Sequence, residues 1–81
     1  MSNIEKKFGL TVKKRREALG YSQEVFAEKA QIHRTYVSEI ENGRVSLGIH
    51  VAEKIADALG RPLSSLVREA EAEYRAVSKK K

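Results

Sequence analysis

Apolar residues recur along the chain at steps of three and four, which is the spacing that one face of an α-helix produces. No stretch shows four or more clean alternations of apolar and polar residues, so we predict no β-strand. The pattern divides the chain into five expected helices, at about residues 4–19, 22–30, 34–42, 46–59 and 63–77. Short joins between them predict a compact all-α domain over residues 1–78, followed by a basic tail at 79–81.

Residues that cap helices support these boundaries. Gly20 stands where the first helix needs a left-handed residue to end it. Ser22 and Ser46 are expected to be the N-caps of the second and fourth helices. Asn42-Gly43 is interpreted as a helix C-cap, because no alternating strands flank it as they would in a hairpin. The residues expected to be buried in the middle three helices are Val25, Phe26, Ala30, Val37, Ile40, Ile49, Ala52, Ile55, Ala56 and Leu59.

Length and composition narrow the classes of function. Eighty-one residues with 41% hydrophobic and 33% charged content fit a folded domain with a small core, and exclude a multidomain enzyme with a deep cleft. A net charge of +5 favours a polyanionic partner. The absence of cysteine excludes disulfides and thiolate chemistry. No apolar run approaches the roughly 18 residues of a membrane span or resembles a signal peptide, so we expect a cytoplasmic protein without a membrane partner.

The segment from about residue 22 to 43 carries the strongest functional pattern. It predicts two helices of about eight residues joined by a turn of three or four residues, which is a helix-turn-helix unit. Ala27 stands where the two helices are expected to cross, and its methyl group allows a close approach. A helix presented in this way fits the DNA major groove, which is about 12 Å wide.

Further residues fall at the spacing of a known family: Phe8-Gly9, Arg16, Ser22-Gln23-Glu24, Ala27, Ile32, Ser38, Ile40-Glu41-Asn42-Gly43 and Ile55-Ala56-Asp57-Ala58-Leu59-Gly60. By these residues, about 8–66 of the chain resembles the phage-repressor-like (XRE-type) helix-turn-helix regulators, which have a lambda-repressor-like fold. Two shorter stretches, 33–38 and 45–47, look like the controller proteins of restriction–modification systems. Those relatives are homodimers that bind inverted repeats near promoters, so the resemblance implies double-stranded DNA and a second copy of this chain as partners.

The resemblance also implies which residues contact DNA. It places four residues of the recognition helix against base edges: Arg34, Thr35, Ser38 and Glu39. Their chemistry agrees, since arginine can pair with guanine, threonine can touch a thymine methyl group and glutamate can accept a hydrogen bond from cytosine. The phosphate contacts that it implies are Ser22, Gln23, Asn42 and Arg44, and the hydroxyl of Tyr36 could add one more.

The chain departs from the family pattern at two places. Gln31 occupies the turn position at which the family prefers glycine, and a left-handed residue with a Cβ costs about 1 kcal/mol there. The family's proline after Gly43 is also missing, and Val45-Ser46 stands in its place. Both departures affect the geometry of turns and leave the motif itself intact.

Charged residues of the first helix have two sets of expected roles. Arg16 and Glu41 match a buried ion pair of the family, and we favour this over two solvated charges because Arg16 lies on the apolar face of its helix. Lys13, Lys14 and Arg15 are either phosphate contacts or part of a solvated helix face. The sequence leaves these two roles open.

The last predicted helix carries an apolar stripe that is too long for the core of a domain this size. We expect its first half to close the core over the fourth helix, and its second half, around Tyr74, to pack against a second copy rather than fray. The expected dimer contacts are Leu66, Val67, Ala70, Tyr74 and Val77.

These features predict a sequence-specific, double-stranded DNA-binding transcriptional regulator that works as a homodimer, with its recognition helix in the major groove. Two histidines without clustered carboxylates make a poor metal site, and no nucleophile turn or phosphate loop is visible. We therefore expect no metal, no cofactor and no enzymatic activity. Two alternatives stay open: an antitoxin whose C-terminal helix binds a toxin, and a protein-interaction module that has lost DNA binding. RNA polymerase also stays open as a partner.

Overall fold

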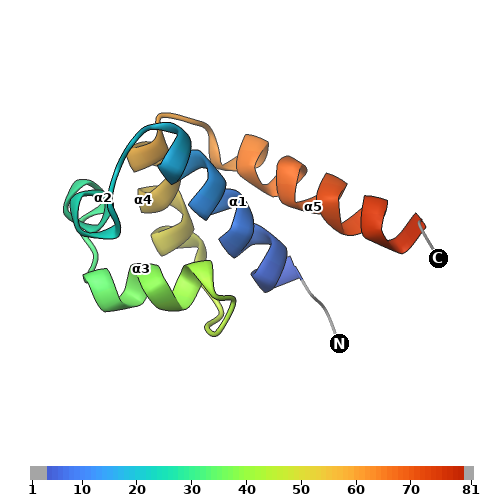
Figure 1. Cartoon of the computed structure of the whole chain (residues 1–81), viewed down its shortest axis with the longest axis horizontal. Coiled ribbons are helices and arrows are strands. Elements are labelled where there is room, and N and C mark those ends of the chain that lie inside the picture. Colours follow the sequence, from blue (N-terminus) through green and yellow to red (C-terminus); the bar gives the residue numbers. More distant parts are fainter. Residues whose placement is uncertain (1–3, 80–81) are drawn as a thin grey trace.

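The computed structural model describes the backbone of residues 4–79 and the side chains of residues 4–72. The part it describes consists of five α-helices and no strand, which confirms the predicted all-α fold. They are α1 (Ile4–Ala18), α2 (Gln23–Ala30), α3 (Arg34–Glu41), α4 (Ile49–Leu59) and α5 (Leu63–Lys79). Figure 1 shows α2 and α3 at one end of the molecule and α5 on the opposite side of α1. Lys79, predicted as the first residue of the basic tail, is instead the last residue of α5, while residues 80–81 and the side chains of Tyr74 and Val77 lie outside this description.

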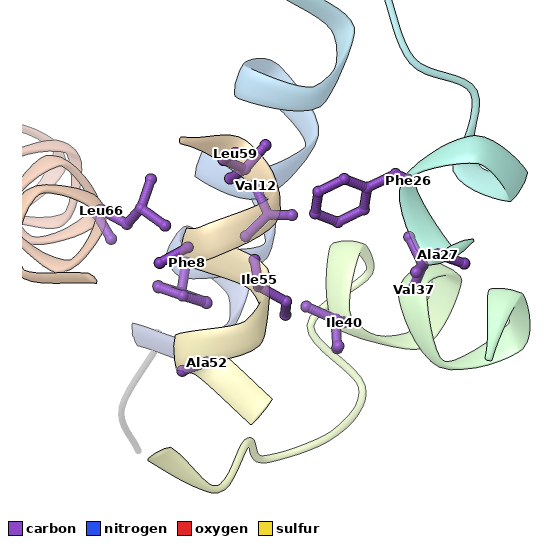
Figure 2. Packing of buried hydrophobic residues seen from close by; sticks show 12 residues of the cluster. Phe8, Val12, Phe26, Ala27, Val37, Ile40, Ala52, Ile55, Leu59 and Leu66 are labelled. Carbon is purple, nitrogen blue, oxygen red and sulfur yellow. The ribbon is translucent and has the colours of Figure 1, made fainter. Parts of the chain in front are cut away.

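The core contains side chains from all five helices. Phe26, Ile55 and Leu66 are the largest fully buried side chains, and each contributes about 1.5–3 kcal/mol through the removal of apolar surface from water. Figure 2 shows the core side chains converging on α4 from the four other helices. Since α3 packs against both α1 and α2, and α2 also packs against α4, the relative position of α2 and α3 depends on this shared core.

The first half of α5 closes the core, but mainly along α1 and less over α4 than the sequence predicts. With 15 residues, α1 offers α5 a longer face than the 11 residues of α4 do. Leu66 and Ala70 are 0% exposed within a single chain. Their predicted role as dimer contacts is therefore wrong, since a second copy cannot reach them.

Helix caps agree with the sequence in α2 and differ in α4. The Ser22 hydroxyl oxygen accepts a hydrogen bond from the backbone N–H of Val25 at 3.1 Å, as an N-cap does. The prediction that Ser46 caps the fourth helix is wrong, because the N-cap of α4 is Gly48, two residues later, and the helix begins at Ile49. The Ser46 hydroxyl instead donates to the carboxylate of Glu5 at 3.4 Å.

Two residues predicted to be buried are exposed. Val25 is 42% exposed, because it lies on the outer side of the first turn of α2. Ile49 is 80% exposed, because the later start of α4 makes it the first helical residue instead of one within the helix. The remaining predicted core positions of these helices, such as Ala52 and Leu59, are buried.

Gly9 lies where α1 crosses α3. A Cβ built on it would collide with the backbone carbonyl oxygen of Ile40 and would lie 3.1 Å from that of Glu41. The two helices can therefore approach each other this closely only because residue 9 has no side chain.

Gln31 ends α2 in the left-handed conformation, with φ 60° and ψ 44°. Replacing it by glycine is expected to raise the free energy of unfolding by about 1 kcal/mol, since glycine adopts this conformation without a Cβ clash. Thermal denaturation followed by circular dichroism measures the change in Tm. Gln31→Ala, which keeps the Cβ, is the control and should melt close to the parent protein. A Gln31→Gly variant that melts no higher than Gln31→Ala would contradict the prediction.

Candidate DNA-binding surface

The two helices of the predicted motif are joined by a turn that fixes where α3 starts. Gln31 ends α2, and His33 is the N-cap of α3 with an extended backbone (φ −72°, ψ 143°). The Nδ1 atom of His33 accepts a hydrogen bond from the backbone N–H of Thr35 at 3.1 Å. On the inner side of α3, Val37 and Ile40 are buried in the core. The recognition helix is thus held at its start and along one face.

The opposite face of α3 carries the four candidate base-reading residues. Positions 34, 35, 38 and 39 share this face, because residues one and four apart lie on neighbouring sides of a helix. Arg34 and Thr35 are exposed, and Ser38 and Glu39 are half-buried. The structure therefore gathers these four residues into one strip that begins at the N-terminal turn of α3.

The candidate phosphate contacts flank this strip, and several are already hydrogen-bonded within the protein. The Ser22 hydroxyl caps α2, the Gln23 amide donates to Glu41 at 3.0 Å, and the Asn42 amide donates to the carbonyl oxygen of Ser38 at 2.8 Å. Arg44 is exposed in the loop after α3. Tyr36 is half-buried and packs against the core.

A buried ion pair joins α1 to the end of α3. The guanidinium of Arg16 donates from Nε and Nη2 to both carboxylate oxygens of Glu41, at 2.7 and 3.1 Å. Its Nη1 donates to the carbonyl oxygen of Tyr21 at 2.7 Å. The hydrogen bond to Glu41 raises the pKa of Arg16, against an opposing effect of burial. The pair that the sequence favoured is thus present, and it holds the helix-turn-helix unit against α1.

Arg15 lies on a different side of α1 and contacts α5. Its Nε and Nη2 donate to the two carboxylate oxygens of Glu69 at 3.1 and 3.0 Å. Successive helical residues differ by about 100° in direction, so Arg16 faces α3 while Arg15 faces α5. Because α5 and the helix-turn-helix unit lie on opposite sides of α1 (Figure 1), Arg15 is removed from the candidate phosphate contacts. Lys13 and Lys14 are exposed and remain candidates.

An apolar groove that the sequence did not reveal opens beside the start of α4. It has a volume of about 300 Å³, and its lining includes Leu47, Ile49, Leu63 and Val67. Ile49 is 80% exposed and Val67 is 37% exposed. The sequence signal for this surface was Gly48, which is an acceptable N-cap directly before an apolar run and would have placed Ile49 at the helix start.

Among the residues with described positions, no three His, Cys, Asp or Glu side chains are grouped so that they could hold a metal ion. Within the same part of the chain, none of the helices combines the length and the apolar character needed to cross a membrane.

Comparison with known proteins gives three close similarities. The chain is 42% identical over 74 residues to the control protein C.MunI of a Mycoplasma species, covering 90% of this chain and 100% of that protein. It is 40% identical to the control protein C.BamHI of Bacillus amyloliquefaciens, covering 73% of this chain and 74% of the relative. The crystal structure of the restriction–modification controller protein C.AhdI from Aeromonas hydrophila superimposes with a TM-score of 0.73 at 33% identity, over 75% of this chain and 92% of that one.

The family match spans the same elements that build the candidate surface. Residues 12–66, from the middle of α1 to the first turn of α5, match the helix-turn-helix family HTH_3. That range contains α2, α3 and both partners of the buried ion pair. The family is one of transcription regulators and not of enzymes. The chain therefore belongs to the HTH_3 (XRE-type) helix-turn-helix family and is a DNA-binding transcriptional regulator.

Proposed function

We propose that this regulator is a cytoplasmic homodimer that binds an inverted-repeat operator and controls genes of a restriction–modification system. The observation that carries the proposal is the strip of base-reading side chains on α3, exposed at Arg34 and Thr35, while the opposite face of the same helix is fixed in the core. The similarity to proteins named as restriction–modification controllers supports the regulated system.

In the proposed complex, α3 lies in the major groove and its neighbours contact the backbone. Arg34 would pair with a guanine through two hydrogen bonds, and Thr35 would contact a thymine methyl group. The N-terminal N–H groups of α2 attract a phosphate, and Ser22 and Gln23 stand at this end of the helix. Asn42, Arg44 and the Tyr36 hydroxyl would bind phosphates beside α3, and Lys13 and Lys14 would add sequence-independent affinity.

The proposed dimer contact is the apolar groove, here called the α4–α5 groove, lined by Leu47, Ile49, Leu63 and Val67. An isoleucine side chain that is 80% exposed is unfavourable in a monomer, and a twofold contact would cover the groove of both copies at once. Val67 stays in the proposed contact, whereas Leu66 and Ala70 leave it. Tyr74 and Val77 stay predictions from the sequence.

Charging this groove is expected to separate the dimer. Ile49→Lys should give a folded monomer at tens of micromolar in sedimentation velocity, because two ammonium groups would be brought together in an apolar contact. Leu19→Lys is the control, since Leu19 is 48% exposed at the end of α1 and does not line the groove. If the parent protein already sediments as a monomer at every concentration, the homodimer is wrong.

The operator itself can be found by selection from a random double-stranded DNA library at about 150 mM salt, which suppresses non-specific binding. Enrichment of an inverted repeat with half-sites about 34 Å apart would support the dimeric regulator. Enrichment of a single half-site would retain DNA reading and remove the dimer. Binding without enrichment that disappears as salt rises would leave only a basic surface, and the protein-interaction module would become the better interpretation.

Arg34→Ala is expected to weaken binding to the selected operator by about 1–3 kcal/mol and to relax base preference at one position of each half-site. Competition binding against operators with a single changed base pair measures both effects. Arg68→Ala removes the same charge from an exposed position on α5 and should leave base preference unchanged. Equal losses in the two variants, with preference retained, would mean that Arg34 acts only through its charge.

A further inference from the structure

The ion pair of Arg16 and Glu41 extends to a third side chain, at the start of α2. The Oε1 atom of Glu41 accepts hydrogen bonds from Nη2 of Arg16 at 3.1 Å and from Nε2 of Gln23 at 3.0 Å. Its Oε2 atom accepts from Nε of Arg16 at 2.7 Å. The carboxylate thus connects a buried arginine of α1 with the first residue of α2, where a phosphate contact is proposed.

The bond to Glu41 fixes which way the Gln23 amide points. A carboxylate at neutral pH only accepts hydrogen bonds, so the amide must present its nitrogen and not its oxygen to Glu41. The nitrogen carries two N–H groups, of which Glu41 occupies one. The second N–H is set by the planar amide in a defined direction at the N-terminus of α2.

This arrangement lowers the cost of using a flexible side chain for binding. A free glutamine loses rotamer freedom when it contacts a ligand, and that loss weakens affinity. In this protein Gln23 is half-buried and is already hydrogen-bonded to Glu41 in the absence of a ligand. A hydrogen bond to an ionised acceptor is also stronger than one between neutral groups, which makes the restraint more effective.

Arg16 makes it possible for a carboxylate to do this close to DNA. An unpaired carboxylate beside a phosphate site would repel the ligand. The guanidinium of Arg16 binds both oxygens of Glu41, and the pair carries no net charge. The carboxylate of Glu41 can thereby accept the hydrogen bond from Gln23, while its repulsion of a DNA phosphate is largely cancelled by Arg16.

We propose that Glu41 is a positioning residue for DNA binding: it holds the amide of Gln23 at the N-terminus of α2 so that the second N–H donates to a DNA phosphate. The inference rests on the proposed function, because it assigns a structural residue to the DNA contact of the same surface. It gives the buried pair a role in affinity in addition to its role in folding.

A double-mutant cycle on operator affinity tests this coupling. Gln23→Ala should weaken binding of the full-length protein to the selected operator about 5- to 10-fold, without changing the salt dependence, because a neutral amide releases no counterion. In the Arg16→Met/Glu41→Leu background, which removes the acceptor of Gln23 without leaving a buried charge unpaired, the same Gln23→Ala change should cost less than about twofold. Glu24→Gln is the control background, because it removes an exposed carboxylate from the first turn of α2, next to Gln23. In this background Gln23→Ala should keep its full effect on operator affinity. Melting curves ensure that each variant is folded at the temperature of the binding measurement.

Nuclear magnetic resonance of the side-chain amide gives a readout that does not require a stable Glu41 variant. In the free wild-type protein, the Nε2 proton that donates to Glu41 should be shifted from its position in a solvated glutamine and should exchange slowly with water, and this pattern should persist on the operator.

The possible outcomes separate the inference from the function it rests on. Equal losses from Gln23→Ala in both backgrounds, or Nε2 proton shifts and exchange rates like those of a solvated glutamine, would overturn the positioning role. Tight operator binding that Gln23→Ala leaves unchanged would overturn it as well, while the regulator itself would stand. Failure to enrich any operator would instead remove the proposed function.

Discussion

Replacing Glu41 by alanine is expected to lower the free energy of unfolding by about 3–5 kcal/mol, the cost typical of removing one partner from a buried ion pair. The Glu41 side chain is 3% exposed and that of Arg16 is 9% exposed, so water cannot replace the lost carboxylate. Two of the guanidinium hydrogen bonds would disappear, and only the bond to the Tyr21 carbonyl oxygen would remain. Among the described residues every buried side-chain N or O atom now has a hydrogen-bond partner, and this variant would break that condition.

Urea denaturation at low temperature measures this loss as a shift of the midpoint at constant slope. Glu53→Ala, which removes an exposed carboxylate from α4, should change stability by less than about 0.5 kcal/mol. The double variant Arg16→Met/Glu41→Leu should recover much of the loss, since it leaves no charge unpaired in the interior. An unchanged midpoint in Glu41→Ala would mean that the pair contributes nothing to folding.

Adding one methyl group at Gly9 is expected to cost about 3 kcal/mol or more, although alanine is the better helix former by about 1 kcal/mol. The added Cβ would collide with the carbonyl oxygen of Ile40, and a backbone atom cannot rotate out of the way as a side chain can. Relief requires α1 to move away from α3, which would also lengthen the bonds between Arg16 and Glu41. The steric penalty therefore exceeds the gain in helix propensity.

The same denaturation experiment compares Gly9→Ala with Gly48→Ala. A Cβ at Gly48 meets no atom within 4 Å, and the residue has φ −71°, which alanine adopts readily. The control should lose no more than about 1 kcal/mol, the difference between glycine and alanine at an N-cap. If Gly9→Ala were as stable as Gly48→Ala, the close approach of α1 and α3 would not restrict residue 9.

Most of the fold could be predicted from the sequence because the apolar spacing specifies which face of each helix is buried. What the spacing does not specify is where a helix begins when two residues are acceptable caps. For that reason the sequence predicts a cap at Ser46 and a buried Ile49, whereas the structure has its cap at Gly48 and an exposed Ile49. An apolar stripe also does not say which protein covers it. For that reason the sequence predicts that a second copy buries Leu66 and Ala70. In the structure they are buried within the same chain, where α5 packs mainly against α1.

The candidate site was predictable to the extent that it depends on helical spacing within α3. The common face of residues 34, 35, 38 and 39 follows from the helix alone. Contacts between distant segments depend on how helices cross, which spacing does not contain. The bonds from Arg15 to Glu69 and from Gln23 to Glu41 are of this kind, and neither could be deduced from the positions of these residues in the chain.

The close contact at Gly9 also limits how the protein can measure DNA. Because α1 lies directly on the backbone of α3 at Gly9, the recognition helix has no space there to move toward α1. In the proposed dimer, the two α3 helices would therefore be presented at a defined spacing and relative orientation. One inserted base pair moves a half-site by about 3.4 Å and rotates it by roughly 35° about the DNA axis. On an operator with this altered spacing, the dimer would have to bend the DNA or bind it weakly, because α3 is restrained within each protomer.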